Sequence, residues 1–241
     1  MPERPVTAPP AAPRHFDAAY TELARLRDGT EVELRLTRAE DKDLLRTGFE
    51  RLSPRSRYAR FLSPKTHLTH DELRYLTEVD QENHFAMGAV RHDPDGPVGV
   101  GIARFIRLPG LHATAEAAIA VADEVHGRGL GRLLFVRLCA AAAERGIEHF
   151  RCEVLGSNNS MRGLIEEVSP DCKFEVGGGV MSIDMLLPDV TPTEPHHDAP
   201  APAGPMYRLF RAAAQNMVEW GEAMRRMFRG GGDEPPPSSH G

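Results

Sequence analysis

The stretch VADEVHGRGLGRLL, residues 121–134, decides how this sequence is interpreted. The apolar run AAIAVA leads into it, and a segment rich in helix-forming residues follows. This pattern predicts a strand, a tight turn and the first turn of a helix. The turn itself combines glycines with basic residues: Gly127, Arg128, Gly129, Gly131 and Arg132.

A strand that enters a helix through such a turn is, in outline, a phosphate-binding site. The first amides of a helix have no intrahelical acceptor and carry a positive partial charge. Glycines let the main chain approach a bulky anion, and arginines add charge and forked donors. We therefore expect a phosphate group at this turn. Close packing of a strand against a helix is the structural alternative for a glycine-rich turn.

Two common phosphate motifs do not match this turn. A Walker loop needs a lysine and then a serine or threonine after its glycines, and no such pair follows here. The dinucleotide fingerprint G-x-G-x-x-G would place its third glycine at Arg132. Glu153 stands at a plausible distance for a ribose-binding acid, but the order of predicted elements is wrong for that fold.

The rest of the sequence predicts an α+β domain with a mixed sheet, because strands and helices do not alternate strictly. DPDG, residues 93–96, separates two apolar runs and predicts an antiparallel hairpin. Start signals predict helices at Thr37, with Glu40 completing a capping box, at Ser53-Pro54 and at Thr69. The other expected elements are a short helix from Phe16 to Arg27, strands at 31–36, 84–90, 98–106, 114–123 and 149–155, at least one strand within 174–187, and helices from 130 to Gly146 and from Asn158 to about Val168.

The glycine turn resembles the pyrophosphate loop of the GNAT N-acetyltransferase superfamily, [Q/R]-x-x-G-x-[G/A]. His126 replaces the glutamine that often begins this turn, and Arg128 occupies the variable position. Asn158, with Met161 three residues later, matches a family asparagine that often contacts the pantetheine or phosphate arm. The resemblance covers about residues 31–187.

This resemblance implies a GNAT fold, in which a mixed, mostly antiparallel central sheet is flanked by helices. It implies acetyl-CoA as the acyl-donor substrate. No metal is expected, because the cysteines have no metal spacing and His196-His197 gives no metal set. The strand before the turn is expected to splay from its neighbour HFRCEVL, so that the pantetheine arm lies between them and the phosphates lie on the turn. The donor-binding residues that the resemblance implies are Ile119, Val121, His126, Gly127, Arg128, Gly129, Leu130, Gly131, Arg132 and Asn158.

Acetyl transfer needs a neutral amine, whereas an unperturbed lysine has a pKa of about 10.4. Glu116, in the otherwise apolar strand TAEAAIAVAD, is the candidate general base. A surface carboxylate on an exposed strand face is the plainer interpretation. The run GIARF…AEAAIAVADEVHGRGLG favours the base, because it is similar to that of bacterial Pat-type protein lysine acetyltransferases, whose "AE" glutamate has this role.

Three further features bear on this resemblance. The segment RLSPRSRYARF resembles the S-x-x-S-x-Y-x-R-F segment of Pat-type enzymes at Ser53, Ser56, Tyr58, Arg60 and Phe61. Many GNAT members carry a tyrosine seven residues after the asparagine, but Ile165 stands there, so no such acid can protonate the leaving thiolate. Cys152 has no evident base partner and is interpreted as a packing residue, which favours direct transfer without an acyl-enzyme.

We therefore expect an acetyl-CoA-dependent N-acetyltransferase whose acceptor is a protein lysine. Two alternatives stay open: a small-molecule amine acetyltransferase, and an acyl-CoA-binding regulatory module with weak or no catalysis. The missing tyrosine and an appended helix motivate the second alternative. Pat-type relatives often carry a separate regulatory domain, and none is visible in this sequence, so no effector is inferred.

Composition sets the broader class. The formal net charge of -6 argues against a general nucleic-acid binder. No stretch approaches the roughly 20 apolar residues of a membrane span. Three cysteines without metal spacing fit a reducing compartment, so we expect a cytoplasmic protein.

The ends of the chain differ in composition from its centre. A basic amphipathic helix is expected near the C-terminus, where it would dock on its own domain, self-associate or bind a partner; a role at a membrane is the alternative. The expected organisation is a disordered segment at 1–14, a GNAT domain with a short N-terminal helix at 15–188, a Pro-rich linker at 189–205, the amphipathic helix at 206–229 and a disordered tail at 230–241.

Overall fold

The computed structural model describes residues 14–54, 56, 57, 65–177 and 179–188. The expected N-terminal segment lies outside the described residues except for Arg14, whose guanidinium pairs with Glu82. The expected linker, amphipathic helix and tail also lie outside them.

The described residues form one sheet of 8 strands in the order β1-β2-β3-β4-β5-β6-β8-β7. All neighbouring strands are antiparallel except β5 and β6, which are parallel. This is the mixed, mostly antiparallel sheet that the sequence predicted. The strands are β1 (Thr21–Arg25), β2 (Glu31–Leu36), β3 (His84–Asp93), β4 (Gly96–Arg107), β5 (Thr114–Val121), β6 (His149–Leu155), β7 (Lys173–Gly177) and β8 (Val180–Leu186).

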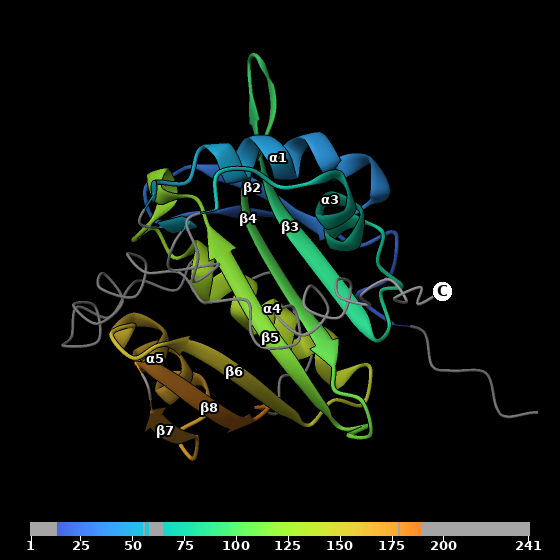
Figure 1. Cartoon of the computed structure of the whole chain (residues 1–241). Helices are drawn as coiled ribbons and strands as arrows, with labels where there is room; N and C mark the ends of the chain where they lie inside the picture. Colours follow the sequence, from blue (N-terminus) through green and yellow to red (C-terminus); the bar gives the residue numbers. More distant parts are fainter. Residues whose placement is uncertain (1–13, 55, 58–64, 178, 189–241) are drawn as a thin grey trace, which may run out of the picture.

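Helices cover the two faces of this sheet unequally (Figure 1). α1 and α3 pack on one face, which we call the α1 face, over the first half of the sheet. α4 and α5 pack on the opposite face, the α4 face. The fully described helices are α1 (Lys42–Glu50), α3 (His70–Thr77), α4 (Leu130–Ala143) and α5 (Asn159–Val168), with short 3-10 turns η1 (Ala39–Asp41) and η2 (Asp123–Val125).

Alternation along the strands fixes which residues face which helices. On β4, Phe105 belongs to the core under α4, whereas Ile102 belongs to the core under α1 and α3. Gly101 permits close approach of α4, since a Cβ there would lie 2.8 Å from Leu134 Cδ1. On β5, Ile119 faces α4 and Ala120 faces α1.

Among the described residues, no helix covers the α1 face over the second half of the sheet. Arg151 on β6 and Ser182 on β8 are exposed, and the latter pairs with the exposed Glu175 on β7. The alternate residues, such as Cys152 and Ile183, are buried under α5. Within the described part of the chain, the covering of this face therefore ends near β5.

The prediction of a short helix from Phe16 to Arg27 is wrong. Thr21–Arg25 instead forms β1, which pairs with β2 along its whole length. Asp28-Gly29 makes the intervening turn, with Gly29 at φ 89 and its N–H bonded to the oxygen of Leu26 at 2.9 Å. The helix-forming alanine, leucine and arginine residues are overridden by strand pairing.

The prediction that Thr37 caps a helix is also wrong. Its N–H bonds to the oxygen of Ala86 at 2.9 Å, so Thr37 continues the pairing of β2 with β3. Asp41 makes the local turn instead, because its carboxylate accepts the N–H of Arg38 at 2.8 Å. The capping box at Thr69 is confirmed. Of the helix expected after Ser53, only positions 54, 56 and 57 are described, and they are helical.

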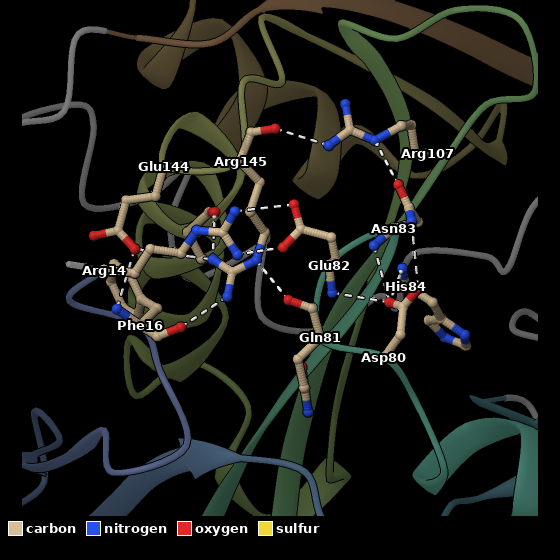
Figure 2. A network of polar contacts seen from close by, with 11 residues as sticks. Arg14, Phe16, Asp80, Gln81, Glu82, Asn83, His84, Arg107, Glu144 and Arg145 are labelled. Carbon is tan, nitrogen blue, oxygen red and sulfur yellow. Dashed lines mark hydrogen bonds and ion pairs between the residues drawn. The ribbon is translucent and has the colours of Figure 1, made fainter. Parts of the chain in front are cut away.

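A polar network ties the beginning of the described chain to the end of α4 (Figure 2). The buried guanidinium of Arg145 donates to the main-chain oxygens of Gln81 at 2.6 Å and Phe16 at 2.7 Å. It also lies 4.4 Å from the ring centre of Phe85, a cation–π contact. These contacts fix the loop before β3, and so the position of His84 at the start of that strand.

Candidate active site

The parallel strands β5 and β6 separate after a short paired stretch (Figure 1). Pairing joins Thr114 to His149, Ala115 to Phe150 and Glu116 to Arg151, and ends there. β6 continues along β8 as far as Leu155, and β5 continues along β4 as far as Val121. The predicted splay is therefore present, and it opens toward the glycine turn.

Main-chain groups of β5 face into this opening. Ala122 donates its N–H to the oxygen of Val100 on β4 at 2.9 Å. Because these groups alternate in direction along a strand, those of Ile119 and Val121 point away from β4, toward the gap beside β6. This is the arrangement in which a flexible arm could replace the missing strand partner.

The glycine turn lies at the wide end of the opening. Gly127 and Gly129 adopt φ 76 and 94, which only glycine reaches without strain. Gly129 precedes the first residue of α4, Leu130, and its oxygen accepts the N–H of Leu133 at 3.1 Å. The amides of Leu130, Gly131 and Arg132 thus precede the first intrahelical bond and lie at the positive end of α4.

Side chains of the turn have separate roles. The His126 imidazole lies 2.9 Å from the oxygen of Val121, so it closes the turn back onto β5. The Arg128 guanidinium pairs with Asp28 in the β1–β2 turn. Leu130 is buried in the core, so only its main chain is accessible to a ligand.

Arg132 and Asn158 extend the site toward α5. The Arg132 guanidinium lies 3.2 Å from Glu167 on α5, and it remains half exposed. Asn158 is buried, and its Oδ1 caps α5 by accepting the N–H of Met161 at 3.1 Å. Asn158 therefore has a structural role in addition to any contact with a ligand.

Glu116 lies at the narrow end of the opening, on the α1 face. It is opposite Ile106 on β4, which in turn is opposite His84 on β3. Burial is the main cause that raises the pKa of Tyr75 on α3 and of Cys152 on β6. The negative charge of Glu116 raises both further, so Glu116 is close to groups on each side of its strand. The candidate base thus lies between the helix-covered and the open parts of this face.

The two cysteines near the site are inert. Burial raises the pKa of the Cys152 thiol to about 12, and a hydrogen bond from Ala117 opposes this effect. Burial likewise raises the pKa of Cys139, on α4. Neither side chain is a thiolate at neutral pH, and so neither is an activated nucleophile. Ile165, at the position of the tyrosine common in GNAT members, is buried.

A buried cluster beside Glu116 was missed from the sequence. Arg104 Nη2 donates to the oxygen of Leu76 at 2.7 Å, and its Nη1 lies 3.0 Å from His84 Nε2. Burial and the neighbouring Arg104 lower the pKa of His84 to about 3, so this imidazole is neutral and accepts the bond. Burial lowers the pKa of Arg104 to about 9. No local motif marks this cluster, because its members come from three elements.

An apolar pocket lies between α1 and the sheet. It contains about 740 Å³ of empty space, part of which is continuous with solvent. Glycines and alanines of the sheet, among them Gly88, Gly99 and Ala120, leave this space. The pocket reaches Val121 but does not include Glu116 among the described residues that line it. An amine held there would not lie against the candidate base.

The described residues show neither a metal-binding group nor a membrane-spanning helix. They contain no group of three or more histidine, cysteine, aspartate or glutamate side chains that could hold a metal ion. None of the helices in this part of the chain is long and apolar enough to cross a membrane.

Comparison with known proteins agrees with this geometry. Residues 46–168 match the model of the acetyltransferase (GNAT) family. The chain is 34% identical to Acetyltransferase Pat of Mycolicibacterium smegmatis over 173 residues, which are 71% of this chain and 51% of Pat. It therefore spans about half the length of that relative.

Two further relatives match over more of their length. Acetyltransferase PA5475 of Pseudomonas aeruginosa is 30% identical over 157 residues, which are 63% of this chain and 84% of that protein. The crystal structure of the GNAT domain of S. lividans PAT superposes with a TM-score of 0.62 at 25% identity, covering 71% of this chain and 99% of that domain.

Proposed function

Because this chain belongs to the GNAT acetyltransferase family, we propose that it transfers the acetyl group of acetyl-CoA directly to the side-chain amine of a lysine in another protein. The observation that carries this proposal is the opening between β5 and β6. It has Glu116 at its narrow end and the glycine turn at its wide end.

The opening and the turn together bind the donor. The pantetheine arm takes the place of a strand partner along Ile119 and the N–H of Val121, whose oxygen contacts His126, and the phosphates lie on the first amides of α4. The Gly127 and Gly129 conformations allow the main chain to approach the phosphates closely. Arg132, half exposed at the start of α4, adds charge to this end of the site.

Glu116 prepares the acceptor. Its carboxylate takes a proton from the lysine ammonium, directly or through water, and leaves a neutral amine. The amine nitrogen then forms a bond to the acetyl carbon and the carbon–sulfur bond breaks. The nitrogen loses its second proton as the amide forms, and this proton passes, directly or through water, to the CoA thiolate that leaves. The transfer is direct, because the thiol of Cys152 is buried and protonated and cannot carry the acetyl group.

Two observations favour a protein acceptor over a small amine. Among the described residues, none of the helices covers the α1 face beside Glu116, over β6, β8 and β7, which leaves room for a macromolecular surface to approach the base. The apolar pocket under α1, where a small apolar amine would fit, does not reach Glu116 among its described lining residues. The relatives named Pat and PAT support the same assignment.

Acetyl-lysine mass spectrometry tests the proposal. A lysate stripped of acetylation is incubated with acetyl-CoA and the wild type or Glu116→Gln. A matched control is Glu31→Gln, which changes an exposed strand carboxylate on β2. We expect new acetyl-lysines on a few proteins with the wild type and the control, and none with Glu116→Gln.

Three other outcomes would contradict parts of the proposal. Acetylation of small amines without any new acetyl-lysine would exclude the protein acceptor. Acetyl-CoA binding without transfer to any acceptor would instead identify a regulatory module. Equal acetylation by the wild type and Glu116→Gln would exclude Glu116 as the base.

A further inference from the structure

Asp123 connects two segments that are far apart in the sequence. It is the first residue of η2, between the end of β5 and the glycine turn. One carboxylate oxygen accepts the N–H of Ser53 at 2.8 Å. The other accepts the hydroxyl of Ser56 at 2.6 Å. Both oxygens of one carboxylate are thus used on a segment 67 to 70 residues earlier in the chain.

The partner segment is the beginning of a helix. Ser53 Oγ accepts the N–H of Ser56 at 3.2 Å, and Pro54 occupies the first helical position. The N–H of Arg57 bonds to the oxygen of Ser53 at 2.9 Å, which closes the first turn. Ser56 is 7% exposed, so its bond to Asp123 is shielded from solvent. Asp123 therefore bonds to the first turn of a helix.

The same residue is close to the donor site. His126 follows three positions later, and its Nδ1 lies 3.8 Å from Asp123 Oδ1. The other ring nitrogen of His126 contacts the oxygen of Val121, which closes the turn. Val125, between them, is 1% exposed and anchors η2 in the core. Movement of Asp123 would therefore shift the start of the turn that receives the phosphates.

We propose that Asp123 is a positioning residue, which holds the glycine turn in its donor-binding conformation through its bonds to Ser53 and Ser56. The inference rests on the proposed function, because it assigns the turn to the donor phosphates. A turn that is already ordered loses less conformational entropy when a ligand binds. Without the carboxylate, that ordering must occur on binding, and donor affinity falls.

Calorimetric titration of the full chain with acetyl-CoA tests this role. Asp123→Asn keeps the shape but removes the charge, and we expect the Kd to rise roughly tenfold, as for the loss of one charge-assisted bond. Ser56→Ala removes one donor and should raise the Kd by about threefold. The double variant, with Asp123→Asn and Ser56→Ala, should bind acetyl-CoA no more weakly than Asp123→Asn alone. The reason is that each substitution disrupts the same connection between residues 56 and 123.

Steady-state kinetics separates positioning from chemistry. With saturating acetyl-CoA, kcat of Asp123→Asn should stay within about twofold of the wild type, while KM for acetyl-CoA rises with the Kd. Glu124→Gln is the matched control, since Glu124 follows in η2 but pairs with Arg91, at 3.0 Å. It should leave both constants unchanged.

The results distinguish this inference from the proposed function. If the wild type binds acetyl-CoA and Asp123→Asn binds it equally well, the positioning role is wrong, even where the melting temperature falls. Additive losses in the double variant would also overturn it, as would a fall in kcat without a change in KM. If the wild type does not bind acetyl-CoA, the proposed function fails and the inference fails with it.

Discussion

Glu116 and Arg151 form the last residue pair through which β5 and β6 are joined. Beyond this pair, the main-chain groups of Ile119 and Val121 face an opening instead of a strand. The main chain of Glu116, the candidate base, is thus fixed by regular strand pairing, and the opening begins at the next residues of β5. A carboxylate in a regular strand is held more precisely than one on a loop.

Glu116→Gln should lower kcat by about a hundredfold or more, because a general base contributes typically 10²–10⁴ to the rate. The amide cannot accept the ammonium proton but has nearly the same shape. The Kd for acetyl-CoA, measured by calorimetry, should stay within about twofold, since the proposed donor site uses the main chain of β5 and not the Glu116 side chain. Near-wild-type kcat would show that another group accepts the proton.

Gly129→Ala should weaken acetyl-CoA binding by about tenfold or more. Gly129 has φ 94, and a side chain in this region costs roughly 1–2 kcal/mol, so the turn before α4 would rearrange. The control is Gly146→Ala, which places the same change at φ 69 after the other end of α4. Both variants should melt earlier, but only Gly129→Ala should alter the Kd. Equal affinities would remove the turn from the donor site.

His84 should make the folded state less stable in mild acid. Its folded pKa is lowered to about 3 from 6.5, so between these values the unfolded chain binds a proton that the folded chain does not. Stability therefore falls as pH decreases below 6.5, by about 2 kcal/mol between pH 7 and pH 5. Urea unfolding at both pH values measures this difference.

His84→Gln should remove most of that difference, because glutamine does not titrate. His67→Gln is the control, since His67 is exposed before α3. It should leave the difference between the two pH values unchanged. If His84→Gln retained the full wild-type loss of stability, other groups would be responsible for it.

The elements that were predicted correctly have local signals. Alternation marks β2, the DPDG turn marks the β3–β4 hairpin, and alternate glycines mark the start of α4. β1 was missed because its residues favour a helix in isolation and become a strand only through β2. The signal that could have found it is Asp28-Gly29, a common hairpin turn.

The residues of the candidate site likewise divide into those that a local sequence pattern predicts and those that it does not. Glu116 and the glycine turn could be selected because each lies in a continuous pattern of residue types. Arg104 and His84, or Asp123 and Ser56, come from separate elements and meet only after the sheet has formed. Buried polar contacts of this kind have no sequence period, and so a single sequence does not reveal them.

Cys152→Ala tests whether an acyl-enzyme contributes. The thiol is buried, and its pKa is raised to about 12, so it should remain protonated throughout turnover. We expect kcat of the variant to stay within about threefold of the wild type, although removal of buried sulfur lowers the melting temperature. Intact-protein mass spectrometry of the wild type mixed with acetyl-CoA should show no covalent acetyl adduct. An adduct that is absent from Cys152→Ala, together with loss of turnover, would instead establish a two-step transfer through this cysteine.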